Sequence, residues 1–88
     1  MFVVVSYDIE DNKRRNKACN ELKNYGEHIQ YSVFECNISQ VQIKKLQMYL
    51  DKIIDKRQDS IRYYFLCQKC LYKLIIQGRK FSRFPIIP

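Results

Sequence analysis

The N-terminal segment is the feature that most restricts how this chain can fold. Residues 2–8 open with Phe followed by three Val residues, and side chains of this kind favour an extended strand. Apolar and polar residues do not alternate along this run, so both faces of the strand are expected to be covered. A chain of 88 residues builds one domain with a small core. We therefore expect a single domain whose first strand needs cover on two sides.

Two helices are expected after this strand. Helical spacing of apolar residues marks residues 12–25 and 40–56. Asp11 or Asn12 is placed to cap the first helix, with Asp11 favoured, and Ser39 with Gln42 forms a capping box at the start of the second. Each cap satisfies backbone N–H groups that a helix start leaves without partners. The two helix starts are therefore defined by sequence.

The remaining segments predict strands. Residues 28–38, with a bend near Tyr31, residues 61–67 and residues 71–77 are rich in β-prone side chains, and Gly26 stands where a left-handed helix end is expected. The order is β-α-β-β-α-β plus one extra C-terminal strand. This is the ferredoxin-like α+β pattern, with two helices on one face of an antiparallel sheet.

The ferredoxin-like pattern leaves one sheet face without helices. Because the first strand is apolar on both faces, the second face is expected to bury against a second copy, which makes the chain a homodimer. We divide the chain into a ferredoxin-like domain of residues 1–78 and a basic tail of residues 79–88. The extra strand and this tail could pair with the partner's sheet edge or dock on a partner subunit.

The charge balance favours a polyanionic partner. The chain has 16 Lys and Arg residues against nine Asp and Glu, a formal net charge of +7. Basic residues gather at 13–17, 44–45, 52–57 and 79–83, so nucleic acid is the expected partner. We find neither a secretory leader nor an apolar run of the ~18 residues that a membrane span needs. Four cysteines are then expected to be reduced, in a cytoplasmic protein.

One carboxylate deserves a functional interpretation. Asp8 ends the first strand, an acidic turn follows, and the basic cluster at 13–17 begins a helix whose N-terminus attracts phosphate. A lone Asp at a strand end is, taken by itself, more often a turn or cap residue. The neighbouring sequence decides between the two interpretations.

That neighbouring sequence resembles a known family. The matching segments, in chain order, are Tyr7-Asp8-Ile9, Glu10-Asp11, Arg14-Arg15-Asn16-Lys17, Leu22-x-x-Tyr25-Gly26 and Ile29-Gln30-Tyr31-Ser32-Val33-Phe34-Glu35-Cys36. In this order and spacing the chain resembles the small CRISPR-associated protein of spacer acquisition, the endoribonuclease-type subunit that partners the CRISPR integrase. Residues 39–88 agree in architecture without a distinctive motif.

The resemblance implies a magnesium-dependent nuclease. Asp8 matches the carboxylate that binds a divalent metal, usually Mg²⁺, near the axis of a homodimer, and Tyr7 matches an aromatic residue of the same catalytic site. The implied partners are the CRISPR integrase and RNA or DNA. Two alternatives remain open: a non-catalytic scaffold that bridges integrase dimers and grips DNA, and a toxin-like ribonuclease of the same fold.

Further residues are implied to bind nucleic acid. Arg15 and Lys17 match basic positions, and Arg14 belongs to the same cluster. His28 stands where related chains often carry arginine, and Phe34 matches an aromatic residue. We expect Asp8 and the basic cluster to contribute little to folding.

Cys67 and Cys70 have the spacing of a metal or redox pair. No second Cys pair or His follows to complete a tetrahedral zinc site. The sequence alone therefore favours neither zinc nor redox use.

Overall fold

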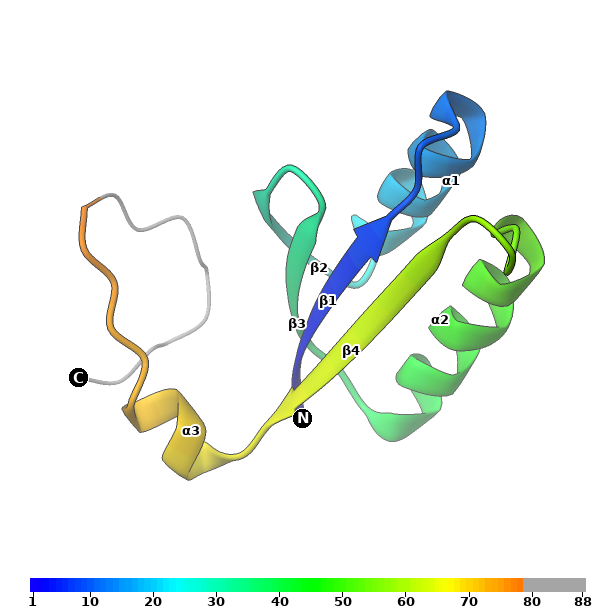
Figure 1. Cartoon of the computed structure of the whole chain (residues 1–88). Coiled ribbons are helices and arrows are strands. Elements are labelled where there is room, and N and C mark those ends of the chain that lie inside the picture. The colour runs from blue at the N-terminus through cyan, green and yellow to red at the C-terminus, as the bar shows by residue number, and fades with distance from the viewer. Residues whose placement is uncertain (79–88) are drawn as a thin grey trace.

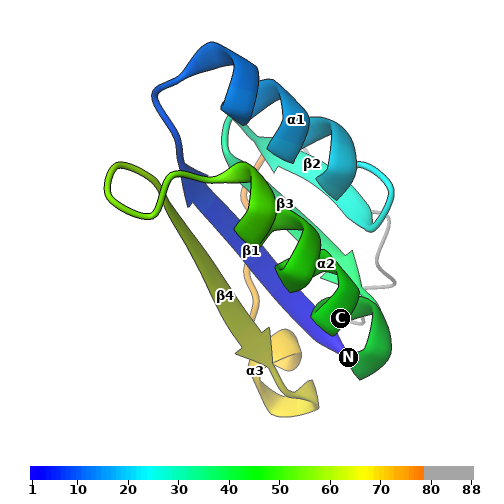
Figure 2. The same cartoon turned by 90° about the vertical axis from the view of Figure 1, so that its right-hand side faces the viewer.

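The computed structural model describes residues 1–78. Its elements, in chain order, are β1 (Phe2–Asp8), α1 (Asn12–Leu22), β2 (Gly26–Gln30), β3 (Val33–Asn37), α2 (Gln40–Ile53), β4 (Ser60–Leu66) and α3 (Gln68–Tyr72). The strands form one sheet in the order β2-β3-β1-β4, with every neighbouring pair antiparallel. Helices α1 and α2 lie side by side on one face of this sheet (Figures 1 and 2). The predicted ferredoxin-like α+β fold is confirmed.

Strand β1 sits inside the sheet and separates its two faces. Val3, Val5 and Tyr7 point toward the helices and are buried. The alternate residues Phe2, Val4, Ser6 and Asp8 point to the opposite face, which we call the open face because α1 and α2 do not cover it. The core between sheet and helices is closed by the fully buried side chains of Leu22, Phe34, Leu46 and Leu50.

Both helix starts are capped as predicted. The Asp11 carboxylate accepts a 2.9 Å hydrogen bond from the backbone N–H of Arg14. Ser39 and Gln42 form a reciprocal capping box at α2. The helices end earlier than expected, at Leu22 and Ile53, because turns lead directly from them into the following segments.

Gly26 has a different role from the one predicted. It begins β2, and its φ is not positive, so the expected left-handed helix end is wrong. A Cβ at this position would lie 2.3 Å from the carbonyl oxygen of Glu35 and 2.5 Å from Sγ of Cys36. Glycine is therefore required because β3 passes too close for any side chain.

The extra strand predicted at residues 71–77 is also wrong. Residues 68–72 form the short helix α3, and no strand follows within the described residues. Leu71 and Leu74 line one hollow on the open face with Phe2 and Val4. Two residues three apart reach the same surface from a helical turn, whereas strand alternation would send them to opposite sides.

The predicted basic tail, residues 79–88, lies outside the described residues, so the proposed division of the chain stays a prediction. None of the helices in residues 1–78 combines the length and apolarity of a membrane span.

Candidate active site

Asp8 lies on the open face at the end of β1. It is exposed, and its partner across the ladder is Ser60, the first residue of β4. The two strand ends enclose a hollow of about 160 Å³. Its lining residues are Ser6, Tyr7, Asp8, Ser60, Arg62 and Tyr64. We call this the Asp8 hollow.

Arg62 places a positively charged side chain beside the Asp8 hollow. Arg62 pairs with Ser6 in the β1–β4 register, two residues along each strand from the Asp8–Ser60 pair, so the Arg62 and Asp8 side chains share the open face. A side-chain hydrogen bond with Tyr64 is the main cause that raises the pKa of Arg62 above its ordinary value. A carboxylate and a guanidinium thus border one hollow. Such a pair can hold a cation and a phosphate together.

Sequence reasoning missed Ser60, Arg62 and Tyr64 as site residues. The strand at 61–67 was recognised, but its pairing with β1 was not specified. Had that register been known, strand alternation would have placed these three residues beside Asp8. The sequence does not show which strands pair when they are far apart along the chain, as β1 and β4 are.

Tyr7 faces away from Asp8. Its ring is buried against Phe34, with centroids 6.4 Å apart, and its hydroxyl donates a 3.3 Å hydrogen bond to the carbonyl oxygen of Tyr31. Burial and then a hydrogen bond with Cys19 raise the pKa of Tyr7 to about 12. The phenol stays protonated at neutral pH, and only part of Tyr7 borders the Asp8 hollow. Its catalytic role stays a prediction.

His28 and Phe34 form a stacked pair rather than two surface contacts. Their ring centroids are 4.5 Å apart with planes at 3°, and Nε2 of His28 lies 2.9 Å from the carbonyl oxygen of Tyr31. His28 is exposed on β2, whereas Phe34 is fully buried. This placement leaves Phe34 no surface for a ligand, so His28 is the accessible member of the pair. Nucleic-acid contacts by either residue stay predictions.

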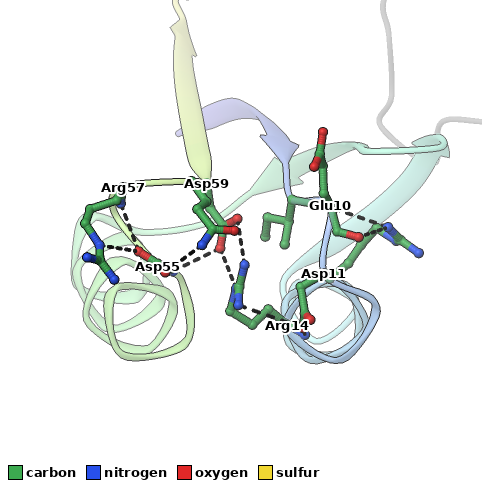
Figure 3. Close-up of polar contacts among 9 residues, drawn as sticks. Glu10, Asp11, Arg14, Asp55, Arg57 and Asp59 are labelled. Carbon is green, nitrogen blue, oxygen red and sulfur yellow. Dashed lines mark hydrogen bonds and ion pairs between the residues drawn. The ribbon is translucent and has the colours of Figure 1, made fainter.

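Arg14 is engaged in an internal ion pair (Figure 3). Its Nε donates to Oδ2 of Asp59 at 2.7 Å and its Nη2 donates to Oδ1 at 3.2 Å. The Asp59 side chain is inaccessible to solvent, and its Oδ2 also accepts a 2.9 Å hydrogen bond from the backbone N–H of Asp55. The expectation that the basic cluster contributes little to folding is therefore wrong for Arg14.

Arg15 is engaged in the turn before α1. Its Nη1 donates to the carbonyl oxygens of Ile9 at 3.2 Å and Glu10 at 3.0 Å, and its Nη2 donates to the side chain of Asn12. Lys17 is exposed on α1. Of the three predicted phosphate contacts in this cluster, Lys17 is the most accessible, and the role of all three stays a prediction.

Comparison with known proteins shows which family this chain belongs to. Residues 1–74 match the family described as CRISPR associated protein Cas2. The chain belongs to the Cas2 family. A relative in Chloroflexus aurantiacus, named a CRISPR-associated endoribonuclease Cas2, is 46% identical over 78 residues, which cover 89% of this chain and 84% of the relative.

Solved Cas2 structures share the fold. The crystal structure of Streptococcus pyogenes Cas2 is 31% identical, with a TM-score of 0.79 over 89% of this chain and 100% of that one. A chain in a partial Cas6-RT-Cas1–Cas2 complex has a TM-score of 0.75 over 85% of this chain and 88% of that one. At 24% identity the second likeness concerns the fold alone. The predicted family is confirmed, and relatives in it carry the name endoribonuclease.

The residues of this Cas2 chain fit a magnesium ion only in part. Within residues 1–78 no three His, Cys, Asp or Glu side chains come together as a metal-binding group. Asp8 is the carboxylate that borders the Asp8 hollow. Mg²⁺ is commonly held by one or two carboxylates and keeps several water ligands, so a single exposed Asp with nearby hydroxyl groups is compatible with it. A second carboxylate would have to come from another copy.

Proposed function

We propose that this Cas2 chain is a homodimeric CRISPR adaptation subunit that binds nucleic acid and cleaves phosphodiester bonds with Mg²⁺ at Asp8. The observation that carries the proposal is the exposed Asp8 carboxylate beside Arg62 in one hollow of the open face. Membership of a family whose relatives are named endoribonucleases supports it. The proposed setting is the cytoplasm.

Each residue of the Asp8 hollow has a part in this chemistry. Asp8 offers carboxylate oxygens to the cation, and Arg62 offers N–H donors to the phosphate that is cleaved. The Ser60 hydroxyl, opposite Asp8 in the ladder, can donate to a phosphate oxygen or to a water molecule. Bound Mg²⁺ would supply an activated water and neutralise charge on the phosphate.

A second copy would complete the site. Val4, Phe2 and Leu66 are only half-buried on the open face, so this face still has apolar area to cover. Packing two open faces together buries that area. It also brings a second Asp8 to the same interface, which would supply the additional carboxylate that one chain lacks. Tyr7 and Phe34 would support the site from the core side of the sheet.

Charge and family suggest the partners. The formal net charge of +7 favours RNA or DNA, with accessible lysines such as Lys17 and the outer lysines of α2 as phosphate contacts. The CRISPR integrase Cas1 is the proposed protein partner, because the chain belongs to the Cas2 family and shares its fold with a chain of a complex that contains Cas1 and Cas2.

One observation favours a second function. A single carboxylate per chain is a small ligand set, and a dimer that only bridges integrase subunits and grips DNA would need none. In that case Asp8 is catalytically idle. A cleavage assay distinguishes the two functions, whereas a binding assay does not.

The deciding experiment is a nuclease assay on RNA, single-stranded DNA and duplex DNA, with Mg²⁺ and with chelator. Wild type is compared with Asp8→Asn and with Asp11→Asn. The second variant removes a carboxylate from the next turn but keeps a good helix cap, since Asn and Asp cap equally well. We expect Asp8→Asn to lose at least about 100-fold in cleavage rate and Asp11→Asn to retain it. Equal cleavage by both variants would refute a role for Asp8. A wild type that binds Cas1 and DNA without cleaving would establish the scaffold.

A further inference from the structure

The connection between β4 and α3 carries two exposed cysteines at close range. Cys67 is the N-cap residue of α3 and Cys70 lies within its first turn. Their Sγ atoms are 3.5 Å apart, within hydrogen-bond reach for sulfur. A disulfide needs an S–S distance near 2.05 Å and Cβ atoms about 3.5–4.5 Å apart, whereas residues three apart on a helix have Cβ atoms about 5–6 Å apart. Closing the bond therefore takes side-chain rotation together with a small backbone adjustment at Cys67, the N-cap, whose backbone is extended rather than helical.

The surroundings favour the thiolate at Cys67. The nearby Cys70 backbone N–H, and then the Cys70 thiol, are the main causes that lower the pKa of Cys67 below its ordinary value. Both cysteines are exposed, so a reagent can approach this pair.

The other two cysteines differ from this pair in exposure and in the features that favour a thiolate. Cys36 is fully buried in the core, and burial raises its pKa to about 11. Cys19 is half-buried and packs against the core. A reagent that discriminates by exposure and thiolate content will therefore select the pair at 67 and 70.

A zinc site is a poorer explanation of this pair. A structural zinc ion takes four ligands. Within residues 1–78 no third His, Cys, Asp or Glu joins Cys67 and Cys70 to form a metal-binding group. A disulfide between two sulfurs at 3.5 Å needs no further protein ligand, only an external disulfide as the two-electron oxidant.

We propose that Cys67 and Cys70 form a reversible dithiol–disulfide site whose substrate is a small-molecule disulfide of the glutathione class. The Cys67 thiolate attacks one sulfur of that disulfide, which forms a mixed disulfide and releases one small thiolate. Cys70 then loses its proton, and its sulfur attacks Sγ of Cys67 and expels the second small thiolate. Two protein thiols lose two electrons and two protons, and the small disulfide takes them up as two thiols.

The site is independent of the proposed nuclease centre. Leu66, which precedes Cys67, pairs with Phe2 at the opposite end of β1 from Asp8. Oxidation therefore acts on the start of α3 and leaves the residues of the Asp8 hollow in place. A test of the cysteines gives the same answer whether or not the chain cleaves nucleic acid.

The test uses the full chain in oxidised and reduced glutathione mixtures containing a chelator, followed by alkylation and peptide mass spectrometry. In the wild type we expect an intramolecular Cys67–Cys70 disulfide that reverses with reduced glutathione. In Cys70→Ser the glutathione adduct should persist on Cys67, because no second sulfur resolves it. Cys19→Ser, the matched control, should form the disulfide to the same extent as the wild type. In the reduced protein, Cys67 should alkylate more than about tenfold faster than Cys36.

Three results would overturn the proposal. The first is a wild type in which the Cys67 adduct persists as it does in Cys70→Ser. The second is a disulfide found only between chains on a non-reducing gel. The third is alkylation of Cys67 no faster than that of Cys36. Both cysteines are exposed, so serine at either position leaves the core unchanged, and circular dichroism verifies this for each variant.

Discussion

Nε of Arg14 donates a 2.7 Å hydrogen bond to Oδ2 of Asp59 and so joins the first turn of α1 to the residue that precedes β4. Ser60 follows Asp59 directly and pairs with Asp8 across the ladder. The ion pair therefore fixes where β4 begins (Figure 3). Through Ser60 it also fixes one wall of the Asp8 hollow. Arg14, which is predicted to contact phosphate, thus has a structural role in positioning one wall of the candidate site.

Asp59→Asn should destabilise the fold. The amide keeps the shape of the carboxylate but loses the charge that Arg14 meets, and one of its two atoms can no longer accept a hydrogen bond. We expect the melting temperature to fall on the order of 10 °C. Asp51→Asn is the control, because its ion pair with Lys56 at 3.1 Å is solvent-exposed and should change the melting temperature by less than about 3 °C. Equal shifts in the two variants would contradict the structural role of Asp59.

The same carboxylate predicts a pH dependence. The hydrogen bond from Arg14 is the main cause that lowers the pKa of Asp59 below its ordinary 3.8. The unfolded state therefore takes up a proton at higher pH than the folded state, so the stability that Asp59 contributes is present above about pH 4. It is lost as the pH falls through the folded pKa. Urea unfolding between about pH 6 and pH 3 should show a steeper loss for wild type than for Asp59→Asn, and parallel curves would contradict this.

Gly26→Ala should lower the free energy of unfolding by roughly 1–3 kcal/mol. A methyl group there would lie 2.3 Å from a backbone oxygen of β3, so β2 must move away from its neighbour. Asn24→Ala, two residues earlier and exposed, is the matched control and should have little effect. Urea denaturation of both variants measures the difference. A stable Gly26→Ala would mean that β2 and β3 are not as closely apposed as described.

Val4→Arg tests the proposed dimer. Val4 lies at the middle of the open face, opposite Glu35 on β3 and Tyr64 on β4. A guanidinium at position 4 would lie beside Glu35 of its own copy, but packing two open faces together would desolvate that ion pair and leave no room for the larger side chain, so we expect a folded monomer by light scattering. Val41→Arg places the same charge on the exposed surface of α2 and should leave the dimer intact. A dimeric Val4→Arg would place the interface elsewhere.

The local features of the fold could be predicted from sequence. The caps at Asp11 and Ser39 depend on neighbours within three residues, and both were correct. Gly26 was assigned a helix-end role because its actual constraint, the backbone of β3, lies about ten residues away and is invisible to local patterns. Residues 71–77 have β-prone side chains, yet Leu71 and Leu74 pack from a helical turn. Tertiary contacts overrode local propensity there.

The candidate site, like the fold, could be predicted from the sequence only where the signal is local. Asp8 was identified from its position at a strand end and from the motif around it. Arg62 was missed because its proximity to Asp8 depends on the β1–β4 register. Phe34 is predicted to bind nucleic acid from the family resemblance and Arg14 from its place in the basic cluster; the structure buries the first and pairs the second with Asp59, and both roles stay predictions. The sequence shows which chemical groups a side chain carries, but it does not show which residue each group contacts in the folded protein.

The pairing of β1 with β4 has a consequence for the order of folding. Among the strands of residues 1–78, β1 is synthesised first and β4 last, with Phe2 opposite Leu66. Closing so long a loop is slow compared with forming the helices or the β2–β3 hairpin. The Asp8 hollow, whose walls come from these two strands, therefore exists only once nearly the whole domain has left the ribosome and its last strand has docked. A partly made chain carries Asp8 without the surroundings that would let it act.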